Sequence, residues 1–262
     1  MNALPYELIR QVTPQASVLL QHNPGPMTLD GTNTWVLRLP GGAEAVVVDP
    51  GETDDEHQAA LVRAAGSIAL VLVTHRHHDH SQAAPALHDA TGAPVRALDP
   101  DHCRGAGPLT DGESIDIAGV RVRVLATPGH TSDSVCFVLE SDEGAATAIL
   151  TGDTILGRGT TVVAHPDGAL GPYLSSLQTL HSLGALTVLP GHGPELPSLA
   201  KVSQEYLAHR EERLTQIREA LTRLGDDATA RQIVEDVYAD VDEAVWWAAE
   251  LSVRAQLDYL RG

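Results

Sequence analysis

The chain has 262 residues, of which 43% are hydrophobic, enough to bury a core and to exclude disorder as its main state. It carries 17 Lys and Arg against 35 Asp and Glu, and the formal charge of −18 at pH 7 argues against an extended basic surface for nucleic-acid backbones. The longest apolar run, residues 68–73, is far shorter than the roughly 20 residues of a membrane helix, and no apolar signal segment follows Met1. We therefore expect a cytoplasmic protein without membrane contacts.

The first three quarters of the chain alternate between short β-branched runs and helical segments. Strands are predicted at residues 17–20, 34–39, 45–48, 68–73, 120–125, 135–139, 146–150 and 187–189, with Gly, Pro and Asp between them. Helices are predicted at residues 54–65, 81–91 and 173–183. This interleaving predicts a layered α/β body that forms a first domain, residues 1–197.

A different pattern follows that body. Apolar side chains recur with a period of 3.6 over residues 202–224, which predicts a long amphipathic helix. Gly225 ends it, and Thr229 and Gln232 have the spacing of a capping box that opens another helix. The two further predicted helices cover residues 230–238 and 242–260. We expect a small all-helical C-terminal domain, residues 198–262, which either packs on the body or acts as a separate binding module.

The segment after the most apolar strand holds four possible metal ligands within six residues. They are His75, His77, Asp79 and His80. Imidazole nitrogens and carboxylate oxygens are ordinary ligands of zinc and similar ions, and a loop that leaves a buried strand can direct alternate residues into one pocket. Three further candidates, each preceded by glycine in a turn after a later strand, are His130, Asp153 and His192. Together these seven residues predict a metal site.

The seven residues divide into two sets that share one carboxylate. One ion is expected to take His75, His77 and His130, the other Asp79, His80 and His192, and Asp153 is expected to bridge them. We expect two divalent metal ions, with Zn²⁺ as the first choice and Mn²⁺ or iron as alternatives. Such a pair acidifies a shared water and supplies a bridging hydroxide at neutral pH, so hydrolysis is the expected chemistry.

Two roles besides ligation are assigned from the sequence. Asp79 is expected to be catalytic, because its carboxylate can accept a hydrogen bond from the nucleophile and orient it. His165 is a candidate contact to the substrate that protonates the leaving atom, although a metal-bound water is the alternative.

The order His75-x-His77-x-Asp79-His80, His130, Asp153 and His192 resembles the five-motif signature of the metallo-β-lactamase superfamily. The resemblance spans residues 17 to about 193. It implies an αββα sandwich with the site at one edge of the two sheets, and it gives all seven positions the ligand roles of the family.

A narrower resemblance is to the beta-lactamase-like protein 2 group. It rests on the motifs at residues 23–26, 31–34, 152–157 and 159–163, and on the tail segment 233–238. Members of this group are metal-dependent endoribonucleases that act on single-stranded RNA and have a C-terminal winged-helix-like domain. By this analogy Asn33 faces the substrate cleft, with a turn-forming role as the alternative.

The charge distribution departs from what RNA binding requires. Residues 198–262 carry 8 Lys and Arg against 13 Asp and Glu, a net charge of −5, which leaves −13 for the body. A channel for RNA would therefore have to be formed by a local cluster of basic side chains on an otherwise acidic protein. The candidate arginines for it are Arg76, Arg104, Arg123 and Arg158, and ordinary surface positions are the alternative for each.

The leading interpretation is a dinuclear metal-dependent phosphodiester hydrolase that acts on single-stranded RNA. Hydrolysis of a small ester, thioester or lactone is the alternative, which the negative charge favours. A drug-degrading β-lactamase is disfavoured without an export segment, whereas redox chemistry with iron fits the same ligand types. The alternative of another class is a non-catalytic nucleic-acid-binding or regulatory protein with a structural metal site, against which the open coordination position argues. The sequence does not indicate the oligomeric state.

Overall fold

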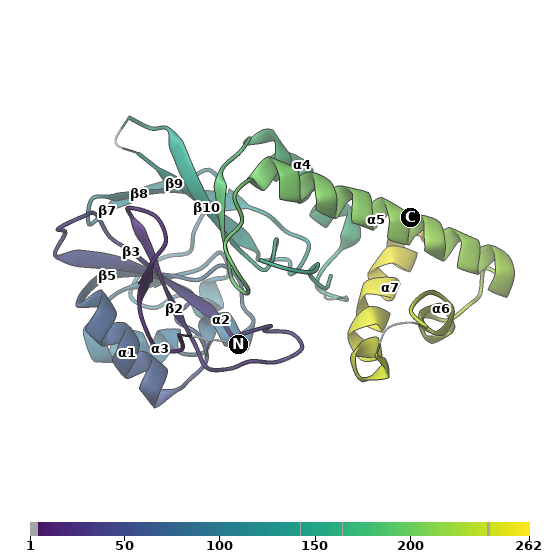
Figure 1. Ribbon diagram of the computed structural model, residues 1–262, viewed down its shortest axis with the longest axis horizontal. Helices are drawn as coiled ribbons and strands as arrows, with labels where there is room; N and C mark the ends of the chain where they lie inside the picture. The colour runs from purple at the N-terminus through teal and green to yellow at the C-terminus, as the bar shows by residue number, and fades with distance from the viewer. Residues whose placement is uncertain (1–4, 142, 164, 240–241) are drawn as a thin grey trace.

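The computed structural model describes residues 5–141, 143–163, 165–239 and 242–262. Two β-sheets face each other, with helices on their outer faces and a helical tail to one side (Figure 1). The first sheet has the order β1-β2-β3-β4-β5-β6. Its strands are β1 (Arg10–Gln11), β2 (Ala16–Leu20), β3 (Asn33–Leu37), β4 (Glu44–Val48), β5 (Ser67–Leu72) and β6 (Val95–Arg96).

The second sheet has the order β11-β10-β9-β8-β7. Its strands are β7 (Ser114–Ile117), β8 (Val120–Ala126), β9 (Val135–Glu140), β10 (Ala146–Gly152) and β11 (Thr187–Pro190). Most neighbouring strands are antiparallel, but β4, β5 and β6 run parallel to one another, as do β10 and β11. The carboxyl ends of β5, β10 and β11 carry most of the candidate metal ligands.

Successive side chains of a strand point to opposite faces of its sheet, and together they form three apolar layers. In β4, Val46 and Val48 face the second sheet, whereas Ala45 and Val47 face the helices behind the first. In β9, Phe137 lies between the sheets and Val138 faces the other side. Both faces of these strands are buried, which is why they read as continuous apolar runs in the sequence.

Helices cover both outer faces of the sandwich. The first sheet is covered by α1 (Asp55–Ala65) and α3 (Ala84–Thr91), and the second by α4 (Leu170–Ser182) and the first part of α5 (Leu199–Leu224). The observed layers confirm the predicted αββα sandwich.

The tail has its own small core. It consists of the end of α5, α6 (Ala230–Val237), the 3₁₀ turn η2 (Glu243–Val245) and α7 (Trp246–Arg261). Ile217 of α5 packs there with Ile233 and Val253, while Leu214, one turn earlier, belongs to the core of the body. The predicted capping box of Thr229 is present. Because α5 contributes to both cores, the domain boundary at residue 197 stays a prediction.

Most predicted helices and strands begin and end within three residues of the observed ones. The helix predicted over residues 81–91 is observed as α3, which starts three residues later, and a separate short helix, α2 (His78–Ser81), precedes it. Pro85 lies in the first turn of α3, where its missing N–H costs little, and this favours a new helix start. The strands β1, β6 and β7 and the short 3₁₀ helix η1 (Pro100–His102) were not predicted.

Among the described residues, no helix is long and apolar enough to span a bilayer.

Candidate metal centre

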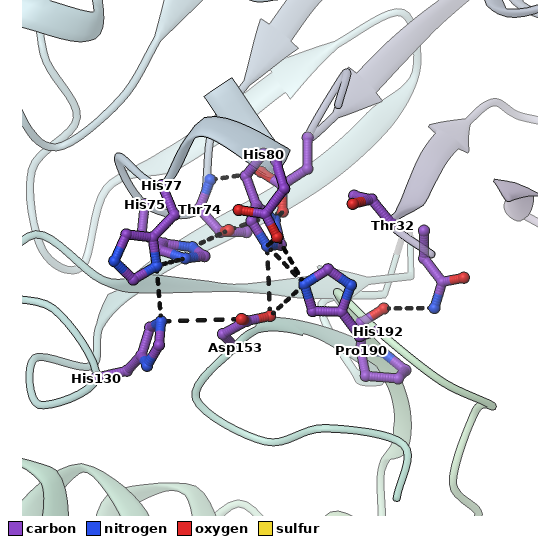
Figure 2. Close-up of polar contacts among 12 residues, drawn as sticks. Thr32, Thr74, His75, His77, His80, His130, Asp153, Pro190 and His192 are labelled. Carbon is purple, nitrogen blue, oxygen red and sulfur yellow. Dashed lines mark hydrogen bonds and ion pairs between the residues drawn. The ribbon is translucent and has the colours of Figure 1, made fainter. Parts of the chain in front are cut away.

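The seven predicted ligands come together at one edge of the sandwich (Figure 2). His75 and His77 follow β5, and Asp79 and His80 lie on the short helix α2. The other three, His130, Asp153 and His192, follow β8, β10 and β11 in that order. Strands that are distant in the sequence therefore end at the same place and bring these side chains together.

Three imidazoles form the first group. The Nδ1 atom of His77 lies 3.0 Å from Nε2 of His75 and 3.0 Å from Nε2 of His130. Burial lowers the pKa of His75 well below its usual value, and burial lowers the pKa of His77 to about 4. All three rings are therefore neutral at pH 7, the form that offers a lone pair to a metal ion.

The second group combines two imidazoles with a carboxylate. Nε2 of His192 lies 3.0 Å from Oδ2 of Asp79 and 3.1 Å from Nε2 of His80. Burial would raise the pKa of Asp79, but the charge on His80 and a hydrogen bond from His192 hold this pKa at about 2. The Asp79 carboxyl is thus ionised throughout the physiological range.

Asp153 lies between the two groups. Its Oδ1 atom is 3.4 Å from Nε2 of both His80 and His192, and its Oδ2 atom is 3.8 Å from Nε2 of His130. The Oδ1 atom is buried and has no hydrogen-bond partner that satisfies ordinary geometry. A buried, unsatisfied carboxylate oxygen among converging imidazole nitrogens fits a metal site, and five imidazoles with two carboxylates suit zinc, manganese or iron.

Hydrogen bonds behind the cluster fix four of the rings. Nδ1 of His130 donates to the Val162 carbonyl at 2.6 Å, and Nδ1 of His192 donates to the Gly31 carbonyl at 3.0 Å. Thr74 Oγ1 lies 3.0 Å from Nδ1 of His75, and Asp49 Oδ2 lies 2.8 Å from Nδ1 of His80. Each bond leaves Nε2 directed at the cluster, as is usual for metal-binding histidines.

Asp49 is a site residue that the sequence analysis missed. Its carboxylate is 1% exposed and accepts bonds from the Thr74 amide at 2.8 Å, the Thr74 hydroxyl at 2.7 Å and His80 Nδ1. The available signal was its position directly after the strand that ends at Val48, followed by Pro50 and Gly51. This carboxylate therefore orients both the first ligand loop and His80.

Replacing this carboxylate with an amide should loosen the site without removing a ligand. We expect Asp49→Asn to weaken metal binding roughly 10- to 100-fold, because the amide accepts fewer bonds than the carboxylate and orients His80 less well. Competition with a coloured chelator measures this affinity. Asp89→Asn, on the exposed face of α3, is the control and should bind metal as the wild type does. Equal affinities in all three proteins would contradict the positioning role.

Gly191 allows the β11 loop to approach the centre closely. A Cβ atom there would lie 2.7 Å from Cε1 of His80 and 2.8 Å from Oδ1 of Asp153. We expect Gly191→Ala to lower the free energy of unfolding by about 1–3 kcal/mol and to weaken metal binding. Denaturant unfolding and metal analysis measure the two effects. Gly107→Ala, where a Cβ atom meets nothing within 4 Å, should leave both unchanged, and the same result for Gly191→Ala would refute this packing argument.

The two expected substrate contacts have other partners in the structure. Asn33 is 6% exposed, and its amide donates to the carbonyls of Pro190 at 3.0 Å and Gly193 at 2.8 Å. It therefore holds the loop that carries His192. His165 pairs with Asp258 of α7 at 2.9 Å, and within the described part of the chain no contact joins it to the seven-residue cluster.

The arginines considered for an RNA channel are mostly neutralised. Arg76 pairs with Asp167 at 2.6 Å, Arg123 pairs with Glu140 at 2.8 Å, and Arg158 pairs with Asp30. Arg104 donates to the backbone carbonyls of residues 101 and 103. Three of the four candidate arginines thus have a carboxylate partner.

Comparison with known proteins agrees with this arrangement. The family model of the metallo-beta-lactamase superfamily matches residues 27–192, and that of the beta-lactamase associated winged helix domain matches residues 229–261. A Beta-lactamase-like protein 2 homolog from Caenorhabditis elegans is 33% identical over 97% of this chain and 86% of its own length.

Two further relatives extend the comparison. The Atrochrysone carboxyl ACP thioesterase of Aspergillus fumigatus is 32% identical over 87% of this chain and 74% of its own length. The solved structure of a beta-lactamase domain protein from Burkholderia ambifaria has a TM-score of 0.82 at 22% identity, over 99% of this chain and 89% of that one, and so shares the fold. The chain therefore belongs to the metallo-beta-lactamase superfamily of hydrolases and carries the winged helix domain associated with it.

Proposed function

We propose that this hydrolase is dinuclear, with His75, His77 and His130 holding one cation, Asp79, His80 and His192 the other, and Asp153 between them. The observation that carries the proposal is that the three ligand atoms of each of these groups lie within 4.8 Å of one another. The ligand atoms of His75, His80 and Asp153 do so as well, and they join the two groups. Bound divalent cations would acidify a water molecule and polarise the oxygen of the bond under attack.

The exposure of the cluster indicates where the substrate enters. His75, His80, His130 and His192 are buried, whereas His77 and Asp79 are partly exposed. The open side of the centre is therefore the side of α2 and its preceding loop. There the ionised Asp79 carboxylate can accept a hydrogen bond from the attacking water and orient its lone pair toward the substrate. This is the catalytic role that we propose for Asp79.

For the substrate we propose a thioester. The relative named as an ACP thioesterase supports this choice, and so does the pairing of three of the four candidate arginines with carboxylates. A short substrate needs no long basic track, whereas extended backbone binding does. Single-stranded RNA is the second candidate, supported by the relative that matches 97% of the chain and by the motifs shared with its group.

A parallel assay decides between these substrates. Protein loaded with Zn²⁺ is incubated with a panel of short-chain thioesters and, separately, with labelled single-stranded RNA. We expect thioester hydrolysis that falls roughly 100-fold or more in Asp79→Asn and is unchanged in Asp89→Asn. Cleavage of the RNA with no thioester turnover would reject the thioester proposal, and activity in neither assay would reject both candidates.

A further inference from the structure

A cavity of about 290 Å³ lies between the catalytic body and the tail, close to the metal centre. We call it the tail cavity. Its body side is formed by Pro26, Met27 and residues 160–162, and its tail side by residues of α5 and α7 with Tyr238 and Val245. It contains both apolar and basic side chains, and none of its lining residues belongs to the seven-residue cluster.

The basic side chains of the tail cavity come from one stretch of α5. They are His209, Arg210 and Arg213, and no carboxylate is among the lining residues. Within the described part of the chain, neither arginine has a carboxylate within 4.0 Å, although most other arginines of this acidic protein form ion pairs. In a chain of net charge −18, these two cations in one cavity thus have no carboxylate partner among the described residues, which suits an anionic ligand.

Both arginines are held in place by uncharged partners. Arg210 is 4% exposed, donates to the Thr161 carbonyl at 2.5 Å and lies 5.1 Å from the centre of the Tyr173 ring. Its Nε atom is buried without a hydrogen-bond partner. Arg213 lies 4.7 Å from the centre of the Tyr238 ring and donates to Gln216. The guanidinium groups are preorganised, and one buried donor is unused.

The same wall of the cavity supports a proposed ligand of the metal centre. Val162 accepts a hydrogen bond from Nδ1 of His130 at 2.6 Å, and the Thr161 hydroxyl lies 3.2 Å from that atom. The carbonyl of Thr161 faces Arg210 instead. Residues 161 and 162 therefore border both the tail cavity and the ring of His130.

We propose that Arg213, His209 and Arg210 form a subsite for a phosphate group on the thiol arm of the thioester substrate. Phosphate suits the site because guanidinium groups bind its oxygens with charge-assisted hydrogen bonds. Burial and the two neighbouring arginines lower the pKa of His209, so its ring is neutral at pH 7 and adds one uncharged N–H donor. This assignment of the substrate rests on the proposed function, whereas phosphate binding by the cavity can be measured without turnover.

Calorimetric titration with inorganic phosphate, on chelator-treated protein so that no metal competes for it, tests the subsite directly. We expect Arg213→Gln to bind phosphate at least about tenfold more weakly than the wild type. Arg218→Gln is the matched control, because Arg218 is exposed on the same helix and pairs with Glu211. If Arg213→Gln fails to fold by circular dichroism, His209→Gln takes its place with the same expectation. No phosphate binding by the wild type, or equal binding by variant and control, would overturn the subsite.

A kinetic comparison tests the source of the phosphate. Two thioesters with the same acyl group are used, S-acetyl-4′-phosphopantetheine and S-acetylpantetheine, which differ only in the phosphate. We expect Arg213→Gln to lower kcat/KM about tenfold or more for the phosphorylated thioester and to leave the other unchanged. An equal loss for both would show a merely structural role and overturn the proposal. Turnover of RNA but of neither thioester would reject the thioester function and this phosphate source, while the titration alone would still decide whether the subsite exists.

Discussion

Asp153→Ala is expected to lower bound metal to less than two ions per chain and to reduce hydrolysis roughly 100-fold or more. The reason is the position of this carboxylate, which lies 3.4 Å from His80 and His192 on one side and 3.8 Å from His130 on the other. Burial would raise the pKa of Asp153, but His192 and His80 outweigh it and hold this pKa well below its usual value. Its negative charge is thus available to both groups at any physiological pH.

Plasma emission spectrometry of the purified protein measures the metal, and thioester turnover measures the rate. Asp89→Ala is the control for loss of a carboxylate and should keep full metal content and full activity, because Asp89 lies exposed on α3. Circular dichroism separates loss of metal from loss of fold. Two bound ions in a folded Asp153→Ala protein would refute the shared role of this residue.

Removal of the metal should lower the melting temperature by roughly 8–16 °C. Two ions that bind only the folded chain, each at about thirty times its Kd, contribute about 2 kcal/mol each and about 4 kcal/mol together. For a chain of this size each kcal/mol corresponds to roughly 2–4 °C. The ligands come from loops after β5, β8, β10 and β11, so bound ions tie both sheets together. Scanning calorimetry with and without a strong chelator, followed by addition of Zn²⁺, measures the shift and its reversal.

Neighbouring histidines supply the matched control for that shift. His77 belongs to the first group, whereas His78 is exposed on α2 beside it. We expect His77→Ala to lose bound metal and to show a smaller effect of the chelator, while His78→Ala behaves as the wild type does. Unchanged metal content in His77→Ala would contradict the ligand assignment, and identical melting curves with and without chelator would contradict the stabilising role of the ions.

The sandwich was predictable because its strands are buried on both faces. A short, continuous apolar run such as residues 68–73 indicates a buried strand. The observed β5 (Ser67–Leu72) differs from the predicted strand by one residue at each end. The strands β1 and β6 are only two residues long, and they are defined by pairing with neighbours, as between Arg10 and Val18. Such pairing depends on tertiary register, and local sequence does not report it.

The metal centre was predictable where its ligands can be recognised from their neighbours in the sequence. Four possible ligands clustered after one strand, and three residues preceded by glycine after later strands, identified the seven residues, and the structure brings all of them together. Asp49 was missed because an aspartate in a turn is ordinary, and its bonds to Thr74 and His80 exist only in the folded chain. Asn33 and His165 were assigned to the substrate, but their partners lie near His192 and on α7, far along the sequence.

In the tail, too, the sequence predicted the helices but not how they pack. Its helices followed from periodicity and capping, including the Thr229 capping box. The sequence did not indicate that α5 contributes to the cores of both body and tail, or that residues 209–213 of this helix contact the cavity beside residues 160–162. That juxtaposition carries the proposed phosphate subsite, and only the packed structure reveals it.

The most direct test of the dinuclear centre is anomalous X-ray diffraction from crystals of metal-loaded protein, recorded at the absorption edge of the bound metal. We expect two peaks about 3.5–4 Å apart, one beside His75, His77 and His130 and the other beside Asp79, His80 and His192, with Asp153 contacting both. A single peak, or two peaks of which neither lies within coordination distance of Asp153, would contradict the dinuclear proposal.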